Sequence, residues 1–190
     1  MNPIPSLSRT LALTAPAVAL TLSGANAASD YLLELDGIKG ESSDSKHAGA
    51  IEIESFSWGA SNPGAIGSGT QGKSITFTLR KRIDKASPLL FLACAKGNHI
   101  PSATITLRKT NSSGGKTDYY QVTLSDCLVS SYQTSSGPPD DQGGTTTGAP
   151  EDRVSFNFQK VVFTYTRLDE TGEPMEEPVR VEHDFSAGTP

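Results

Sequence analysis

Alternation of apolar and polar residues with a period of two runs through most of this 190-residue sequence and restricts it to a β-rich fold. Successive side chains of a strand point to opposite faces, so this period is typical of strands that are buried on one face. It recurs in segments separated by turn residues, at 30–36, 50–60, 73–82, 103–109, 118–133, 153–168 and 179–185. We expect each segment to form a strand of an antiparallel sheet, with 118–133 and 153–168 each forming one long or broken strand.

The segment at 50–60 changes the face on which its apolar residues lie. Ile51 and Ile53 share one face, whereas Phe56 and Trp58 lie on the other. This switch predicts a bulge or a strand whose two faces are both buried.

The segment at 73–82 ends in the densest basic cluster of the sequence, "RKR" at 80–82. Its alternation places Ile75, Phe77 and Leu79 inward and Arg80 outward. We expect the cluster to be a solvated or interface-facing strand end.

One apolar segment, 87–99, has the signals of a short helix instead. Ser87 is the expected N-cap, Pro88 suits the first helical position, and Gly97 is the expected stop. Lys96 would lie in the last turn, where it complements the helix dipole. Several strands and one helix predict a mainly β fold, a compact antiparallel β-barrel or sandwich with one short α-helix.

The first 27 residues have the layout of a secretory signal peptide. Arg9 precedes an uncharged, mostly apolar run of 13 residues, and Ala25 and Ala27 form a small-x-small cleavage site. We therefore expect residues 1–27 to be removed near Ala27, leaving 28–190 as a single domain. The apolar run is too short to span a membrane as an anchor. The mature chain would be secreted to the extracellular space or the periplasm, without inserting into a membrane.

The charge of the chain argues against nucleic acid as a partner. The formal net charge is −5, and loss of Arg9 with the signal peptide would make it −6. No long Lys/Arg run offers a footprint for nucleic acid or for an anionic membrane surface.

The two cysteines, Cys94 and Cys127, allow two alternatives. In an exported protein they could form a disulfide. Each also lies among apolar neighbours within a predicted element, which suits two buried free thiols equally well. The sequence leaves both alternatives open.

The stretch "GSGTQGKS" at 67–74 matches the phosphate-binding pattern G-x-x-x-x-G-K-[ST]. That pattern works when a helix begins at its Lys-Ser, so that the helix amides hold the phosphates. Here a strand pattern follows, so we interpret the stretch as part of a glycine-rich loop, 61–72. This loop and a second one, 135–152, have the length and composition of loops that make contacts outside their own domain.

The sequence offers no clear catalytic or metal-binding constellation. Asp44 lies three residues before His47 and could orient it as a base, but no nucleophile motif accompanies the pair. His47, His99 and His183 do not have metal-ligand spacing. We expect no catalytic residues, no metal site and no cofactor.

The stretch from "LELDGIKGES" to "SFSWG" resembles the haemolysin-coregulated protein (Hcp) family, the tube subunits of type VI secretion systems. "DKASPLLFLACAKGNHI" at 84–100 and "RVSFNFQKVVFTYT" at 153–166 are similar to the helix and a late strand of that family, so the resemblance covers about residues 30–168. The residues that carry the family motif are Asp36, Gly37, Ile38, Lys39, Gly40, Glu41, Lys46, His47 and Trp58.

The resemblance implies a structural protein without enzymatic activity. Its expected partners are copies of itself, as a homo-hexamer whose rings stack into a hollow tube, with small effector proteins in the lumen and other type VI components. The family's extended loop, which contacts the neighbouring ring, corresponds here to Asn62, Pro63, Gly64, Ala65, Ile66 and Gly67. The signal-like segment departs from the family, whose members usually carry none. It keeps open an alternative, an exported ring or monomer that binds an effector or ligand independently of a type VI apparatus.

Overall fold

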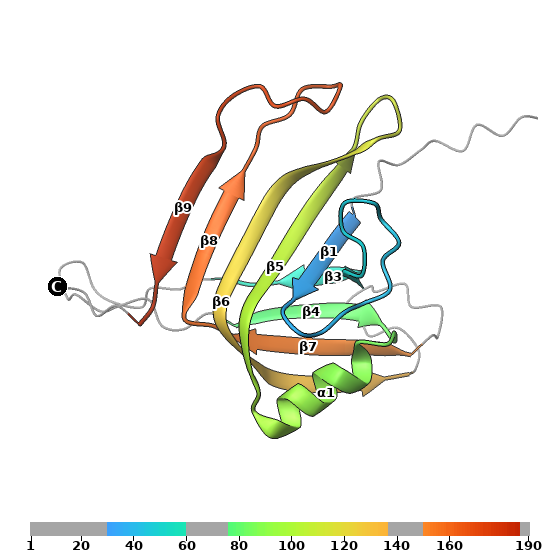
Figure 1. Ribbon diagram of the computed structural model, residues 1–190, viewed down its shortest axis with the longest axis vertical. Helices are drawn as coiled ribbons and strands as arrows, with labels where there is room; N and C mark the ends of the chain where they lie inside the picture. Colours follow the sequence, from blue (N-terminus) through green and yellow to red (C-terminus); the bar gives the residue numbers. More distant parts are fainter. Residues whose placement is uncertain (1–29, 60–75, 137–149, 187–190) are drawn as a thin grey trace, which may run out of the picture.

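The computed structural model describes residues 30–59, 76–136 and 150–186, which form nine strands and one helix (Figure 1). Their bounds are β1 Asp30–Leu35, β2 Ile51–Ile53, β3 Ser55–Ser57, β4 Phe77–Arg82, α1 Ser87–Lys96, β5 His99–Thr110, β6 Lys116–Ser135, β7 Glu151–Asn157, β8 Lys160–Tyr165 and β9 Val179–Asp184.

The strands form an antiparallel barrel with a two-stranded extension. The hydrogen-bonded order β2-β1-β5-β6-β7-β4-β3 begins and ends with strands that are separated only by Glu54, so the sheet closes on itself. β8 pairs with β6 outside this path, and β9 pairs with β8. The prediction of a mainly β, antiparallel fold with one short helix is confirmed.

Strand β6 belongs to both parts of the sheet. Its first part, up to Leu128, lies against β5, and within that part residues 120–125 also pair with β8. Its last part pairs with β7 from Leu128 to Ser135, with an irregularity in the register between Val129 and Ser131. In Figure 1, β6 runs from the upright strands into the layer of β4 and β7 above α1.

The barrel interior is filled by the apolar faces that the alternation predicts. Phe77 and Leu79 of β4, and Ile105 of β5, are fully buried. The other large core residues come from nearly every strand and from α1; they include Leu33, Ile51, Leu90, Val122, Leu124, Val129, Val154 and Phe156. The expected inward position of Ile75 lies outside the described residues.

Helix α1 packs against β6 and ends as the sequence predicts. Gly97 adopts a left-handed conformation with φ 63°, and its N–H binds the carbonyl oxygen of Cys94. Pro88 lies in the first turn, and Leu90 and Ala93 face the barrel. The expectation that Ser87 is the N-cap was wrong: Ala86 holds that position, and Ser87 turns its hydroxyl into a buried polar cluster.

Two predicted strands are each divided in two. The change of face at 50–60 is neither a bulge nor a doubly buried strand: the chain bends at Glu54, so that β2 pairs with β1 and β3 pairs with β4. The segment at 153–168 turns at Phe158 and Gln159, so that β7 pairs with the end of β6 and β8 with its beginning.

Both cysteines are free thiols in the structure. Cys127 is fully buried on β6, and burial raises the pKa of its thiol to about 12. Cys94 is half-buried on α1. Of the two alternatives that the sequence left open, the structure therefore has the unpaired thiols.

None of the helical segments that the structure describes is long and apolar enough to cross a membrane.

Candidate functional site

The family motif forms an ordered loop between β1 and β2, residues 36–50. Gly37 begins it with φ 80°, a conformation that glycine adopts at little cost. Ile38 then bridges back to Leu35 and enters the core. Three backbone hydrogen bonds tie the two arms of the loop together: Gly40 N to Gly49 O, Gly49 N to Ser42 O, and Ser42 N to Ala50 O.

Gly40 is required for space and not for its backbone angles. A Cβ at this position would lie 2.5 Å from Ile51 Cα and closer still to the carbonyl oxygen of Ala50. Both atoms belong to the backbone of the facing arm, so they cannot move aside without separating the arms.

Asp44 anchors the middle of the loop to the barrel. Its Oδ1 accepts hydrogen bonds from the backbone N–H groups of Lys46 (2.9 Å) and His47 (3.2 Å), and its Oδ2 lies 2.5 Å from Nη1 of Arg108 on β5. The hydrogen bond from Arg108, followed by that from Lys46, lowers the pKa of Asp44 from 3.8 to about 2. Arg108 is itself 3% exposed, and its Nε lies 2.9 Å from Oδ1 of Asp118 on β6.

The His47 side chain is buried between two carboxylates. Its Nε2 lies 3.0 Å from Oδ2 of Asp118, and its Nδ1 lies 3.5 Å from Oε2 of Glu34. Asp44 contacts the backbone of His47 and not its ring, so the suggested Asp44–His47 orienting pair is absent. This cluster joins the loop to β1, β5 and β6.

The remaining motif side chains lie on two sides of the loop. Glu41 accepts a hydrogen bond from the backbone N–H of Lys85 (3.0 Å), which connects the loop to the turn before α1. Asp36, Lys39 and Lys46 are exposed. Trp58 follows β3 and stacks on Phe163 of β8, with ring centroids 4.6 Å apart, so it connects the barrel to the extension.

An open pocket of about 420 Å³ lies beside the motif loop. Asp30, Asp44, Glu52, Arg108 and Lys116 supply its charged lining. Asp30 pairs with Lys116 and Asp44 with Arg108. Most of the charge is therefore neutralised within the lining. Little unpaired charge is left in the pocket to bind a charged ligand selectively.

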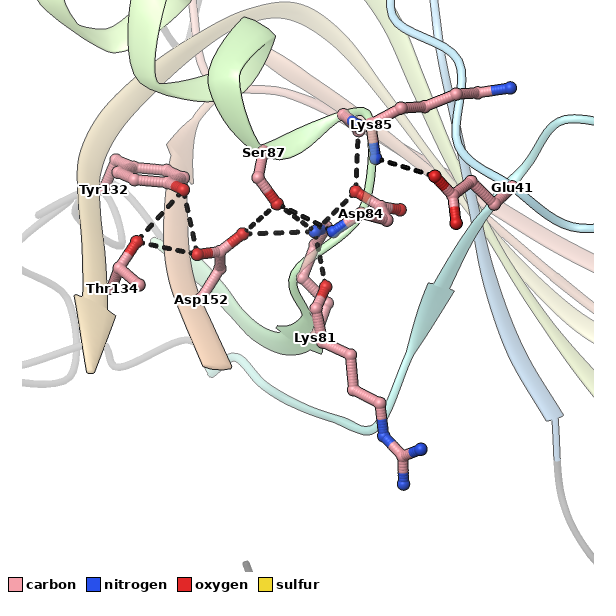
Figure 2. Close-up of polar contacts among 10 residues, drawn as sticks. Glu41, Lys81, Asp84, Lys85, Ser87, Tyr132, Thr134 and Asp152 are labelled. Carbon is pink, nitrogen blue, oxygen red and sulfur yellow. Dashed lines mark hydrogen bonds and ion pairs between the residues drawn. The ribbon is translucent and has the colours of Figure 1, made fainter. Parts of the chain in front are cut away.

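A second buried cluster, centred on Lys81, fixes the base of α1 (Figure 2). The Lys81 side chain is 0% exposed, and its ammonium lies 2.7 Å from Oδ1 of Asp84 and 3.2 Å from Oδ2 of Asp152. It also donates hydrogen bonds to the Ser87 hydroxyl (2.9 Å) and to the carbonyl oxygen of Arg82 (2.7 Å). These contacts join β4, β7 and the start of the helix.

Asp152 is the second centre of this cluster. Ser87 Oγ donates to its Oδ2 at 2.5 Å, and Tyr132 and Thr134 of β6 each donate to its Oδ1 at 2.8 Å. Burial by itself would raise the pKa of Asp152, but the hydrogen bonds from Ser87, Thr134, Tyr132 and Lys81 outweigh it and leave that pKa below its ordinary value. A buried carboxylate with this many donors is stable in its charged form.

The position of Lys81 corrects the expectation for the basic cluster at 80–82. Arg82 is exposed and pairs with Glu54 at 2.6 Å, but Lys81 points into the protein. Although a lysine beside a serine can act in catalysis, the Ser87 hydroxyl here already donates to Asp152 and accepts from Lys81 and from the Asp84 N–H. With Lys81 and Asp152 both shielded from solvent, this cluster has a structural role.

Sequence reasoning missed both charged clusters, although the sequence holds a signal for the one around Lys81. Lys81 continues the inward series Phe77 and Leu79, and Asp152 precedes the buried Val154 by two residues. Lys81 and Asp152 are direct cross-strand partners. A charged residue at an inward position of a strand pattern therefore signals a buried partner.

Several expected features lie outside the described residues. They are the signal peptide at 1–27, the contact loop from Asn62 to Gly67, the glycine-rich match at 67–74, and most of the loop at 135–152. In the part of the chain that the structure describes, no group of three or more His, Cys, Asp or Glu side chains is placed to hold a metal ion.

Comparison with known proteins identifies close counterparts of this barrel. A family described as "Type VI secretion system effector, Hcp" matches residues 32–165. Protein hcp1 of Pseudomonas aeruginosa is 33% identical over 158 residues, which cover 80% of this chain and 91% of that protein. Hcp1 from Salmonella typhimurium has a similar crystal structure, with a TM-score of 0.67 and 29% identity over 85% of this chain and 97% of that one. A structure described as that of a type six secretion system protein superposes with a TM-score of 0.69 and 25% identity, covering 85% and 99% of the two chains.

Replacing Gly40 with alanine should destabilise the fold by about 2 kcal/mol or more, because the new Cβ collides with the backbone at Ala50 and Ile51. Urea unfolding followed by fluorescence would measure the loss. Gly59→Ala is the matched control, since no atom lies within 4 Å of a Cβ at that position. Equal midpoints for the two variants would contradict the steric explanation.

Lys81→Met should cost about 3–5 kcal/mol of unfolding free energy, because it leaves Asp152 charged and buried without its cation. Lys85→Met, at an exposed lysine four residues away, should change stability by about 0.5 kcal/mol or less. Adding Asp152→Asn to Lys81→Met should recover part of the loss. If the Lys81 and Lys85 variants unfold alike, the cluster contributes no stability.

The lowered pKa of Asp44 predicts a specific acid response. The folded state binds this proton more weakly than the unfolded state, so the ionised carboxylate stabilises the fold above about pH 4, and the contribution is lost as pH falls toward 2. Asp44→Asn should therefore flatten the dependence of unfolding free energy on pH in this range. Asp36→Asn, at an exposed carboxylate of the same loop, should keep the wild-type dependence. An unchanged slope in Asp44→Asn would refute the assignment.

Proposed function

This chain belongs to the Hcp family of type VI secretion proteins, and we propose that it is a structural subunit that assembles into hexameric rings stacked as a hollow tube. Membership rests on the family match over residues 32–165 and on the 33% identity to Protein hcp1. Tube subunits of this kind act through their surfaces. The features that matter are therefore the ones that the isolated barrel leaves uncovered.

The observation that carries this proposal is the exposure of β9. This strand pairs with β8 alone among the described strands, and its other edge has no strand beside it. Val179 and Val181 are 58% and 56% exposed, and the residues between and beside them are exposed on both faces. Natural proteins cover such edges, because an open apolar strand pairs with other chains. In a symmetric assembly, a neighbouring subunit can cover the open edge of β9.

We also propose that residues 1–27 are a cleaved signal peptide and that 28–190 is the single mature domain. Support comes from the apolar run after Arg9 and from Ala25 and Ala27. Assembly would then take place in the periplasm or outside the cell, and small effector proteins could occupy the lumen. The loop from Asn62 to Gly67 would contact the neighbouring ring.

The signal-like segment also favours a second candidate function. An exported ring or monomer would be separated from a cytoplasmic type VI machine, and it could bind an effector or another ligand on its own. A small protein that purifies with it would support this candidate.

The decisive experiment expresses the full 190-residue chain and analyses the exported product. Intact mass would show the loss of residues 1–27, light scattering would give the mass in solution, and negative-stain electron microscopy would show its shape. We expect rings of six copies, alone or stacked. A monomer at high protein concentration would overturn the structural-subunit proposal, and a retained leader would overturn export by cleavage.

A further inference from the structure

We propose that the exposed side of α1 in one copy binds the acidic segment before and within β9 of the next copy, in a head-to-tail contact. This inference rests on the proposed self-assembly and names the two surfaces that would meet. Both surfaces are exposed and partly apolar, and their charges are opposite.

The first surface, here called the α1 face, is a stripe along the helix. Leu89, Leu92 and Lys96 follow one another at intervals of three and four residues, so they lie on one side of α1, and Lys85 lies in the turn just before the helix. All four are exposed, and Phe91, 58% exposed, widens the apolar part. The opposite side of the helix carries Leu90 and Ala93 into the core. A helix with apolar residues on both its buried and its exposed side is suited to a second packing partner.

The charge of the α1 face is positive. Lys85 and Lys96 have no ion pair with any residue that the structure describes, whereas Arg82, just before them, is paired with Glu54. Asp84, the one carboxylate between residues 82 and 97, is half-buried and already holds Lys81, and Glu41 of the motif loop accepts a hydrogen bond from the Lys85 backbone N–H. The face therefore presents apolar side chains with a lysine at each end.

The second surface, here called the acidic arm, comprises residues 170–182. Its exposed charged residues are Glu170, Glu173, Glu176, Glu177, Arg180 and Glu182. Glu176 pairs with Arg167, and Glu182 pairs with Lys160 and Arg180. Glu170, Glu173 and Glu177 have no ion pair with a described residue and keep the arm negative. Its exposed apolar residues are Met175, Val179 and Val181, at 56–58%. The arm is thus an apolar strip bordered by carboxylates, the electrostatic complement of the α1 face.

The two surfaces lie at opposite ends of the molecule. In Figure 1, α1 is at the bottom of the view, and the connection between β8 and β9 is at the top. A surface that binds a different surface on an identical neighbour forms a heterologous contact, which repeats from copy to copy and closes into rings when the rotation allows. A contact between two α1 faces would instead bring lysines together, and one between two acidic arms would bring carboxylates together.

The test reverses the charges of each surface separately in the full chain. Lys85→Glu with Lys96→Glu alters the α1 face, and Glu173→Lys with Glu177→Lys alters the acidic arm. Each double variant should assemble at least about tenfold more weakly than wild type, because like charges then face each other. Mixing the two variants, or combining all four substitutions in one chain, should restore assembly, since the charges are again opposite.

The matched control for the α1-face variant is Lys39→Glu with Lys46→Glu, which makes the same change of net charge at exposed lysines of the motif loop, outside both surfaces. It should assemble as wild type does. Circular dichroism before assembly would show that each variant is folded, and if one surface variant fails to fold, the other still decides. Wild-type assembly that persists in both surface variants, or a mixture that fails to restore it, overturns this contact alone. A wild-type chain that stays monomeric overturns the proposed function as well.

Discussion

Closure of the sheet at Glu54 is the constraint on which the rest of the structure depends. Each strand has one apolar face, so no pair of strands can bury its apolar residues without the others. The bend at Glu54 lets one continuous segment pair with β1 on one side and with β4 on the other, which brings the two ends of the sheet together. Within the closed barrel, Ile51 becomes fully buried. The motif loop, α1 and the extension are all attached to this closed frame.

The buried charged pairs help to fix the register in which the barrel strands pair. Lys81 lies opposite Asp152 in the β4–β7 pairing, and Arg108 lies opposite Asp118 in the β5–β6 pairing. A slip by one residue would turn each charge toward the wrong face and leave its partner buried and unpaired. Apolar residues at these positions would lose burial on such a slip, but they would leave no buried charge unpaired. The charged pairs therefore add to the free-energy cost of a wrong strand register.

The sequence patterns predicted those parts of the structure that depend only on residues near one another in the sequence. The alternation located Phe77, Leu79 and the other inward residues, and Gly97 marked the end of α1 because only a local conformation was needed there. The division at Phe158 and Gln159 was not predictable, because it depends on which part of β6 each half pairs with. The Lys81–Asp152 pair likewise joins residues 71 positions apart. The family motif pointed to the loop at 36–50, whereas the contacts of His47 and Arg108 required the folded barrel.

The long sequence separations have a kinetic consequence. His47 and Asp118 are also 71 residues apart, and Lys116 must reach Asp30 across 86 residues. Barrels dominated by such distant pairings fold slowly, on the order of milliseconds to seconds, because the entropy of closing long loops is lost before the contacts form. A chain that closes late stays extended and accessible after synthesis. Until the barrel closes, its strand edges stay unpaired, so a chain that has not finished folding is open to pairing with other chains.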